Sequence, residues 1–327
     1  MAVSVDSARW LINEMVKVAW QVEEVLSWVG IFYLGKVTLG VAWEVGTGLR
    51  THLWSKMVTR DLPREYGGRW AVVTGATDGI GKAYATELAK NGMNIILVSR
   101  TQEKLENVAQ EIRGRYAVET EIVRADFSVG RTIYDDISKH LEGKEIGILV
   151  NNVGVAGSAL CLFIDAPEDD IWALVNVNVA SVPAMTKLVL PGMIARRKGA
   201  IVNISSAAEI FSLPLLQLYC ASKAFVNRFS EIVEFECRSS GITVQTLVPC
   251  TVWTNMNNFD PAIHKEGWVS PFPSRYAYHA LSTLGYARCT TGYWAHSLQV
   301  WALKKMPSFL LKTMYMKIKK PSQKKHS

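Results

Sequence analysis

The sequence predicts an α/β fold: a doubly wound parallel sheet, preceded by a hydrophobic helix and followed by a basic tail. Three observations lead to this fold class. Short apolar runs alternate with helical stretches from residue 69 to residue 248, a glycine-rich turn joins the first run to its helix, and polar clusters follow several of the runs. Alternation of this kind produces a parallel sheet whose binding site lies at the carboxyl ends of the strands.

Six short runs, most of them apolar, are predicted as strands, because buried parallel strands read as continuous hydrophobic segments. They are residues 70–73, 93–98, 119–124, 146–150, 199–204 and 242–248. Helices are predicted between them at residues 82–91, 101–116, about 130–142 and 171–197. The last helix carries Asn176 and Asn178 in an apolar stretch, and a buried amide needs a hydrogen-bond partner. We therefore expect one of the two to bond a backbone carbonyl or a water molecule.

Composition limits the classes of protein to which the chain can belong. Of its 327 residues, 49% are hydrophobic and 20% are charged, and the formal net charge is +7. From Lys304 onward the chain has eight lysines and no acid, so the residues before Lys304 sum to −1. The positive charge belongs to the tail, and no binding of nucleic acid is predicted for the body. The five cysteines include no CxxC pair, which argues against a disulfide framework or a metal site and suits a reducing compartment.

Residues 25–43 form a nineteen-residue apolar stretch in which Lys36 is the single charge. That length suits a membrane span, although one lysine in the middle costs roughly 2.5–3.5 kcal/mol unless it snorkels. Residues 1–24 lack the basic start and short apolar core of a cleavable signal peptide. We expect a membrane anchor or a helix that lies on the membrane, ahead of a helix packed on the soluble body.

The first predicted strand runs into the turn at residues 74–81, TGATDGIG, and then into a helix. Glycines allow a tight turn and close approach of the backbone to a ligand, and the following helix N-terminus favours a pyrophosphate. The second strand ends at Arg100, and residues 93–100 contain no Asp or Glu to bind the ribose hydroxyls of NAD. An arginine at this place suits a 2′-phosphate, so the cofactor is predicted to be NADP(H).

Tyr219 and Lys223 lie four residues apart on a predicted helix, which places their side chains on one face, one turn apart. A free tyrosine has a pKa of about 10 and is a poor acid–base catalyst near neutrality. A fixed cation favours the phenolate, and lowering the pKa to about 7 takes about 4 kcal/mol of preferential interaction. The pair predicts a catalytic tyrosine whose pKa is lowered by the lysine and a nicotinamide cation. A lone pair at this spacing also occurs on ordinary amphipathic helices, so the prediction depends on the upstream motifs.

Five motifs occur together and in order along the chain. They are Thr74-Gly-x-x-x-Gly-x-Gly, Asn151-Asn-x-Gly, Ser206, Tyr219-x-x-x-Lys223 and Pro249-x-x-Val-x-Thr254. This set resembles the short-chain dehydrogenase/reductase family over roughly residues 67–290. The segments GRWAVVTGATDGIGKAYATELAK, EIGILVNNVG and LVLPGM resemble its membrane-associated branch of 17β- and 20β-hydroxysteroid dehydrogenases. One member of that branch is catalytically silent because the motif tyrosine is replaced, whereas Tyr219 is present here.

The resemblance implies a Rossmann-type sheet and a catalytic role for four residues. Tyr219 would be the general acid that protonates a carbonyl oxygen, and Ser206 would hydrogen-bond the same oxygen. Lys223 would bind the nicotinamide ribose and lower the Tyr219 pKa. Asn178 would hold a water that links Lys223 to solvent. Each assignment transfers a family role onto the matching position of this sequence.

The resemblance also implies how the cofactor is held. Arg100 would bind the 2′-phosphate, Asp126 the adenine edge, and Val252 and Thr254 the carboxamide side of the nicotinamide. The implied cofactor-binding residues are Gly75, Asp78, Gly79, Ile80, Gly81, Arg100, Asp126, Asn152, Tyr219, Lys223, Val252 and Thr254. No metal ion is expected. His279, His296 and Cys220 are expected to pack rather than to bind.

The function that follows is an NADPH-dependent ketosteroid reductase, with the 20-keto group of a C21 steroid such as cortisone as first choice. Residues 255–274, rich in aromatic residues and proline, are expected to be a lid over an apolar substrate. Alternatives are a very-long-chain 3-oxoacyl-CoA reductase or 17β-hydroxysteroid dehydrogenase, and a non-catalytic NADP-binding scaffold. A homodimer is left open.

The expected organisation is an anchoring segment at 1–66, an NADP-binding catalytic domain at 67–303 and a basic tail at 304–327. Basic residues are more frequent after the apolar stretch than before it, which keeps the large domain cytosolic if the stretch spans. Lys324 and Lys325 resemble the dilysine retrieval signal of endoplasmic-reticulum membrane proteins. We expect an endoplasmic-reticulum membrane protein with a cytosolic catalytic domain; the alternative is the mitochondrion.

Overall fold

The computed structural model describes residues 2–158, 160–254 and 267–318. The chain divides into two compact units, Met1–Arg50 and Thr51–Ser327, which we call the N-terminal unit and the sheet unit. The lysine pair near the C-terminus and residues 255–266 of the predicted lid lie outside the described residues. The predicted functional division after residues 66 and 303 stays a prediction.

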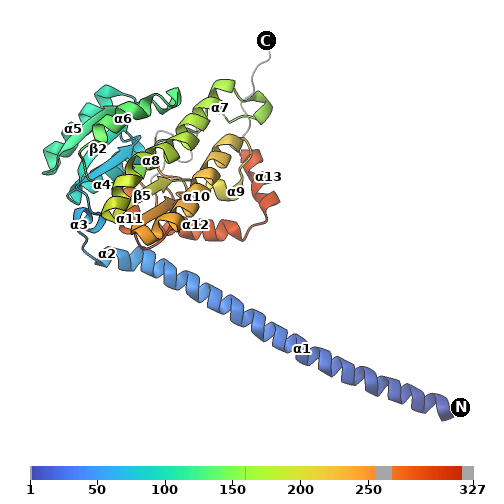
Figure 1. Cartoon of the computed structure of the whole chain (residues 1–327). Coiled ribbons are helices and arrows are strands. Elements are labelled where there is room, and N and C mark those ends of the chain that lie inside the picture. Colours follow the sequence, from blue (N-terminus) through green and yellow to red (C-terminus); the bar gives the residue numbers. More distant parts are fainter. Residues whose placement is uncertain (1, 159, 255–266, 319–327) are drawn as a thin grey trace. The chain divides into compact units, whose positions relative to one another are not determined.

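A seven-stranded, all-parallel sheet forms the centre of the sheet unit (Figure 1). Its order is β3-β2-β1-β4-β5-β6-β7. The strands are β1 Trp70–Thr74, β2 Asn94–Ser99, β3 Thr120–Arg124, β4 Ile146–Asn151, β5 Gly199–Ile204, β6 Ile242–Leu247 and β7 Cys289–Thr290. The first six agree with the predicted strands to within one residue at each end, and β7 is too short to leave a sequence pattern. The predicted doubly wound parallel sheet is confirmed.

Thirteen α-helices occur in the described residues. They are α1 Ala2–Leu49, α2 Ser55–Met57, α3 Leu62–Tyr66, α4 Gly79–Lys90, α5 Gln102–Arg115, α6 Ile133–Leu141, α7 Glu168–Leu174, α8 Ser181–Arg196, α9 Ala208–Phe211, α10 Gln217–Cys237, α11 Pro273–Ser282, α12 Trp294–Lys304 and α13 Ser308–Ile318. Short 3-10 turns lie at η2 Phe127–Val129, η3 Phe163–Asp165 and η5 Arg238–Ser240, and π-helical turns at η1 Arg50–Trp54 and η4 Val175–Ala180.

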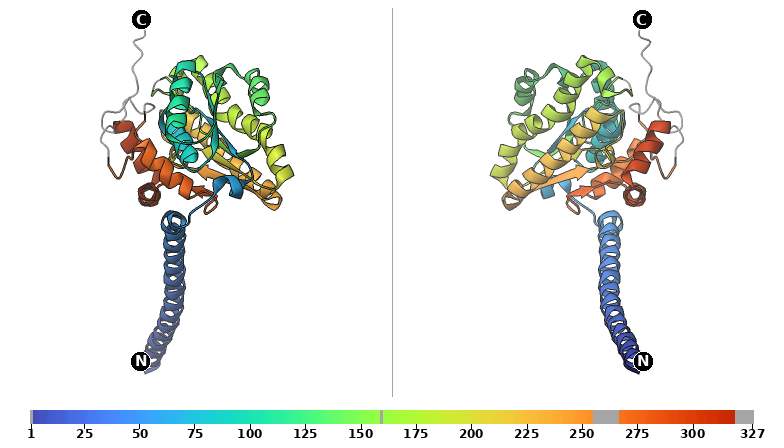
Figure 2. Two further views of the ribbon diagram at one scale, coloured as in Figure 1. Left: turned by 90° about the vertical axis from the view of Figure 1, so that its left-hand side faces the viewer. Right: turned by 90° about the vertical axis from the view of Figure 1, so that its right-hand side faces the viewer.

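The two faces of the sheet are covered by different helices because side chains alternate along each strand. Ala71 and Val73 of β1 point into a core with apolar residues of α4, α5 and α11. Their neighbour Val72 points into a second core with residues of α6, α8 and α10. Figure 2 shows the sheet unit from two opposite sides, with the helices around the sheet.

The chain moves outward from β1 to β3 and then returns to β4, so the strand order reverses beside β1. Ligands bind at such a reversal in open α/β sheets.

The predicted helix at 171–197 is one continuous helical stretch that begins three residues earlier, in which the π-helical turn η4 separates α7 from α8. Single π turns inside α-helices are frequent at functional sites. Both amides of η4 bond backbone carbonyls: Asn176 Nδ2 donates to Ser128 O at 2.9 Å, and Asn178 Nδ2 to Val155 O at 2.8 Å. The expectation of a backbone partner is confirmed for both.

The N-terminal unit consists of the helix α1, which contains the predicted apolar stretch at 25–43. Two helical stretches of the described chain are long and apolar enough to cross a membrane, Ser7–Met57 and Glu168–Arg196. In the second, 44% of the most apolar window is buried, which is the pattern of a core helix in a soluble domain. None of the corresponding window in the first is buried, so it is burial, and not composition, that distinguishes the first stretch, which contains most of α1, from the second.

Candidate active site

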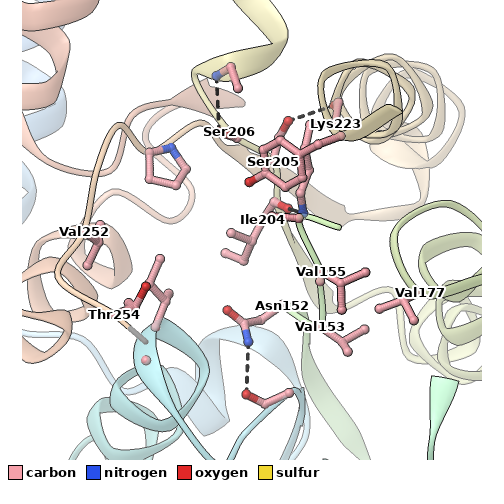
Figure 3. A pocket seen from close by; sticks show the side chains of 18 of the residues that line it. Asn152, Val153, Val155, Val177, Ile204, Ser205, Ser206, Lys223, Val252 and Thr254 are labelled. Carbon is pink, nitrogen blue, oxygen red and sulfur yellow. Dashed lines mark hydrogen bonds between the residues drawn. The ribbon is translucent and has the colours of Figure 1, made fainter. Parts of the chain in front are cut away.

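A cavity of about 1030 Å³ lies at the carboxyl ends of the strands, as the sheet order requires. Its walls come from the segments that follow β1, β2, β3, β4, β5 and β6, and from α10, α12 and α13. Figure 3 shows how Asn152, Ser206, Lys223, Val252 and Thr254 surround this space. These five come from four different segments of the chain, and the fold brings them to one cavity.

The glycine turn after β1 packs tightly against the segment after β4. Gly75 and Gly79 have φ angles of 65° and 53°, in the left-handed region that favours glycine. A Cβ on Gly81 would overlap the Asn152 side-chain amide and the carbonyl of Gly75. Asn152 Nδ2 donates to Thr74 O at 3.0 Å and to Gly75 O at 3.2 Å. The amide of Asn152 therefore holds the turn in shape.

The turn ends at the N-terminus of α4, on the cavity wall. Asp78 caps this helix, because its Oδ1 accepts a hydrogen bond from Gly79 N at 2.7 Å. Ile80 lies beside it on the cavity wall. A helix N-terminus behind a glycine turn offers free backbone N–H groups and a favourable dipole to a phosphate. The close-packed glycines and this helix end fit the pyrophosphate of a dinucleotide.

Two cations border the cavity beyond the end of β2. Arg100 is exposed and makes no hydrogen bond within the described part of the chain. Lys104 lines the same part of the cavity, four residues further on. The sequence analysis did not include Lys104, although an i, i+4 spacing from Arg100 across the first turn of α5 could have indicated it. The pair suits a phosphate that projects from an adenosine ribose.

Asp126 follows β3 on the same wall. Its Oδ1 accepts hydrogen bonds from the Ser128 backbone N–H at 3.0 Å and from the Ser128 hydroxyl at 2.7 Å. These two bonds, followed by the charge of Arg100, hold the pKa of this carboxyl below its usual value. Thr77 Oγ1 and Ser99 Oγ, 2.9 Å apart, form a second polar pair that the sequence analysis missed.

The predicted catalytic residues meet where β5 and α10 approach each other. Tyr219 and Ser206 both line the cavity and their side chains interact, and Ser206 Oγ accepts a hydrogen bond from Ala208 N at 3.2 Å. Lys223 is buried and donates from Nζ to Ile204 O at 2.9 Å. Ser205 Oγ donates to the backbone carbonyl of Lys223 at 2.8 Å, which holds α10 against the end of β5 (Figure 3). Ser206, Tyr219 and Lys223, which the sequence motifs grouped, therefore lie close together in the structure.

The pKa values within this cluster are set mainly by burial. Burial raises the pKa of Tyr219, and the interaction with Ser206 opposes that rise only in part. Lys223 is not among the causes of this shift, and its predicted effect on the Tyr219 pKa together with a bound nicotinamide cation stays a prediction. Lys223 Nζ lies 5.8 Å from the Tyr219 ring centroid and is directed to the Ile204 carbonyl. Burial also lowers the pKa of Lys223 to about 8, so desolvation dominates both groups.

Asn178 lies next to Gly154, as Lys223 does, and is 1% exposed. Its Oδ1 accepts from Val155 N at 2.8 Å, and its Nδ2 donates to Val155 O and, at 3.1 Å, to Ser222 Oγ. A Cβ on Gly154 would lie 3.3 Å from Lys223 Nζ and 3.5 Å from Asn178 Oδ1. The glycine therefore lets the segment after β4 run directly past both side chains.

The other end of the cavity is apolar and comes largely from segments that the sequence analysis did not assign to it. Its lining residues include Phe211, Leu213, Leu216, Leu303, Leu311 and Tyr315. Leu311 and Tyr315 belong to α13, in the segment predicted to be a basic tail. Their i, i+4 spacing could have indicated a helix face that packs on the body.

In the described remainder of the predicted lid, Trp268 stacks on Trp294, with ring centroids 6.3 Å apart. Phe272 meets Trp253 edge-on at 5.0 Å. Within the described residues, the cavity lining continues through Gln299 and Leu303 of α12.

The two histidines expected to pack do so. His279 and His296 contact the ring of Tyr293 at 5.0 Å and 5.2 Å, and burial lowers the pKa of each to about 4. Cys220 is buried beside the Leu213 carbonyl. In residues 2–158, 160–254 and 267–318, no group of three or more His, Cys, Asp or Glu could hold a metal ion.

A dinucleotide cradle beside a Ser–Tyr–Lys cluster at the strand ends defines a nicotinamide-dependent oxidoreductase. The family model for short chain dehydrogenases matches residues 69–262. The chain belongs to the short-chain dehydrogenase family, as the sequence motifs indicated.

Two curated relatives are similar over nearly the whole chain. The human inactive hydroxysteroid dehydrogenase-like protein 1 is 46% identical over 94% of this chain and 93% of its own length. The very-long-chain 3-oxoacyl-CoA reductase of the duck Anas platyrhynchos is 45% identical over 90% of this chain and 93% of its own length. The resemblance to the hydroxysteroid dehydrogenase branch of the family, stated from the sequence motifs, is thereby confirmed.

Two solved structures share the fold. A structure from work on 7beta-hydroxysteroid dehydrogenase stereoselectivity has a TM-score of 0.69 and 29% identity, covering 79% of this chain and 99% of its own. A short-chain dehydrogenase from Sphingobium yanoikuyae in complex with NADPH has a TM-score of 0.64 and 25% identity, covering 79% and 98%.

Proposed function

We propose that this protein is an NADPH-dependent reductase of an apolar ketone, with the 20-keto group of a C21 steroid as first substrate. The observation that carries the proposal is that the Tyr219 phenol and the Ser206 side chain line one cavity together, between a dinucleotide cradle and an apolar cavity end. A proton donor at that place serves one reaction well: addition of hydride to a carbonyl carbon together with a proton to its oxygen.

In this mechanism the chain positions and polarises the ketone. Ser206 and the Tyr219 hydroxyl donate hydrogen bonds to the carbonyl oxygen, and Tyr219 then gives up its proton to that oxygen. The raised pKa of Tyr219 keeps the phenol protonated and ready to donate. NADPH supplies the hydride. Lys223 is buried beside the phenol and stabilises the phenolate that remains. Asn178 fixes the backbone of the segment after β4 by accepting a hydrogen bond from Val155 N.

The cofactor preference is proposed to rest on Arg100, whose exposed guanidinium borders the cavity without a hydrogen-bond partner in the described residues. Changing Arg100→Asp should raise the Kd for NADPH about 10- to 100-fold, the loss expected for a charge-assisted hydrogen bond. The Kd for NADH should change little. Arg113→Asp, at an exposed position of α5, is the matched charge reversal and should leave both unchanged. Equal affinity of the unmutated protein for NADPH and NADH would refute this assignment.

A ketosteroid is favoured because the far end of the cavity is lined by apolar side chains from α9, α12 and α13. A hydroxysteroid dehydrogenase is also among the structural neighbours. The second candidate is a very-long-chain 3-oxoacyl-CoA, favoured by the 45% identity to the duck reductase. NADPH consumption with a panel of 20-keto, 17-keto and 3-keto steroids and a long-chain 3-oxoacyl-CoA tests both. Faster turnover of the acyl-CoA than of every steroid would reverse the ranking.

A non-catalytic scaffold is the remaining alternative, because the human relative is named inactive. Tyr219, Ser206 and Lys223 are all present here and are in place for chemistry. Tight NADPH binding with no turnover of any panel ketone would favour the scaffold. Turnover that disappears in Tyr219→Phe would exclude it.

We also propose that residues 1–66 anchor the protein in the endoplasmic-reticulum membrane, with the catalytic domain 67–303 in the cytosol. The exposed apolar surface of α1 supports an anchor, and the basic residues that follow it support this orientation. Microscopy of a protein tagged internally tests the organelle. Changing Lys324 and Lys325 to Ser should shift its distribution, and a mitochondrial pattern for the unmutated protein would contradict the proposal.

A further inference from the structure

The outward face of α12 is apolar, which is unusual for a surface helix. Trp294, Leu298 and Trp301 are each 43–49% exposed and follow one another at i, i+4 and i+7, on one side of the helix. The opposite side, with Ala295 and Val300, is buried in the sheet unit. A soluble surface helix would place polar residues where these aromatic and aliphatic side chains lie.

The next helix, α13, is apolar on two sides. Leu311 and Tyr315 line the cavity. Phe309, Leu310 and Met314 are 40–70% exposed. In Figure 2, α12 and α13 appear in orange and red at the edge of the sheet unit in both views. We call the exposed apolar residues of these two helices the α12–α13 face.

Charge along α12 and α13 has a single sign, and the acid whose charge interacts with Lys304 is Glu209 of α9. The chain contains no Asp or Glu from residue 267 to its C-terminus. Lys304, Lys305, Lys312 and Lys317 lie on or directly after the two helices and are exposed. The Lys305 ammonium lies over the ring of Trp301, 5.8 Å from its centroid. Tryptophan and lysine interleaved in this way are typical of helices that lie in the headgroup region of an anionic membrane.

The position of α12 within the sheet unit agrees with such a surface. Ser297 Oγ of α12 hydrogen-bonds His52 Nε2 at 3.0 Å, and His52 is buried. His52 is the second residue of the sheet unit, directly after the apolar helix α1 ends. The hydrogen bond between Ser297 and His52 therefore holds α12 close to the residue at which α1 ends, Leu49.

We propose that the α12–α13 face docks on an anionic lipid surface, as a second membrane contact besides α1. A second copy of the chain fits this face poorly, because two faces that carry only lysines would repel each other. The inner sides of the same helices line the cavity, so docking would bring its apolar end to the lipid. That consequence for substrate entry rests on the proposed function, whereas the docking itself does not.

Hydrogen exchange of the full-length protein tests the docking. The chain is reconstituted into nanodiscs of phosphatidylcholine alone or of phosphatidylcholine mixed with phosphatidylserine, since α1 anchors it in both. Amides of residues 294–318 should exchange several-fold more slowly in the anionic discs. Equal exchange in the two discs would overturn the proposal. So would protection that is independent of lipid and increases with protein concentration, since it would identify a second copy as the occupant.

Variants separate charge from apolar contact. Lys312→Ser with Lys317→Ser should remove most of the additional protection seen in anionic discs, because each exposed lysine near the surface attracts anionic lipid. Trp301→Ser with Phe309→Ser should abolish it, and the exposure of both side chains means that the fold survives. Ile232→Ser with Phe235→Ser, which removes two exposed apolar side chains of α10, is the matched control and should change nothing. Equal effects of the two apolar pairs would contradict a specific face.

Substrate entry has its own readout. Trp301→Ser with Phe309→Ser should raise KM for an apolar ketone presented in anionic vesicles and leave KM unchanged for the same ketone in detergent micelles. If this variant loses the protection from hydrogen exchange but keeps an unchanged KM in vesicles, the docking proposal stands and entry of the ketone from the lipid is rejected. Absence of turnover with every ketone would reject the proposed function, while the exchange experiment would still decide the docking.

Discussion

The two ends of the cavity are built in different ways. The cofactor end is made of backbone: glycines without room for a Cβ, an Asn152 amide clamped to two carbonyls, and the N-terminus of α4. The ketone end is made of apolar side chains from α9, α12 and α13, which meet there from distant parts of the chain. The close packing of the cofactor end leaves little room for substitutions. At the ketone end, by contrast, a single side-chain substitution can change the shape of the cavity without disturbing the backbone. Tyr219, Ser206 and Lys223 stand between the two ends, so each end can be perturbed separately from the chemistry.

The largest effect is expected at the boundary between the ends. Tyr219→Phe should lower kcat about 1000-fold, because a positioned general acid contributes about 10²–10⁴-fold and the ring that remains cannot donate a proton. The Kd for NADPH, measured by quenching of protein fluorescence, should stay nearly unchanged. Activity above a few per cent of the unmutated enzyme would show that the proton comes from elsewhere.

Lys223 should reveal the energetic cost of burying a charge at this boundary. Its pKa is lowered to about 8, so between pH 8 and its unfolded value of 10.5 the unfolded chain binds more protons than the folded one. The free energy of unfolding of the cofactor-free protein should therefore rise with pH in this window, by about 3 kcal/mol relative to Lys223→Met. Urea unfolding at several pH values measures the difference.

The exposed Lys104 provides the control for this measurement. Lys104→Met should change the free energy of unfolding by no more than about 0.5 kcal/mol, as expected for an exposed side chain. A constant difference between the unmutated protein and Lys223→Met from pH 7 to 10.5 would mean that Lys223 is not held at a lowered pKa.

The cofactor end should not tolerate one added methyl group. In Gly81→Ala, the new Cβ overlaps the Asn152 amide and the Gly75 carbonyl, so the turn must open. We expect the Kd for NADPH to rise about 10- to 100-fold, from an overpacking cost of about 1–3 kcal/mol. Gly114→Ala, at a helical position in α5 with no atom within 4 Å of the new Cβ, is the matched control. It should raise stability by about 0.5–1 kcal/mol and leave binding unchanged.

The ketone end should show the smallest and most selective effect. Leu311→Ala removes part of the apolar wall without touching the dinucleotide cradle. KM for the preferred ketone should rise about tenfold, in line with about 1.5 kcal/mol for a large apolar contact, while KM for NADPH stays constant. Thr313→Ala, on the exposed side of the same helix, should change neither constant. A parallel rise of both constants for Leu311→Ala would mean that the two ends are not independent.

The parts that the sequence predicted well share a local origin. The six strands are runs whose apolar character appears in a few consecutive residues, and the turn at 74–81 carries its glycines side by side. The Tyr219–Lys223 pair depends on one helical turn. The order of elements along the chain, a strand followed by a turn and then a helix, was enough to place these groups at one edge of the sheet.

Other features were decided by tertiary structure. Without the cofactor the pKa of Tyr219 depends on how deeply its phenol is buried, which no spacing of residues encodes. Leu311 and Tyr315 are more than ninety residues from Tyr219 in sequence and reach the cavity only because α12 and α13 fold back over it.

The sequence by itself therefore determined the fold class, the family, the glycine turn after the first strand and the grouping of Tyr219 with Lys223, because each is specified by neighbours along the chain. Tertiary structure decided the shape of the ketone end, the state of charge of the catalytic pair and the exposure of the α12–α13 face. These properties depend on desolvation and on contacts between distant segments, and both arise only when the helices have packed.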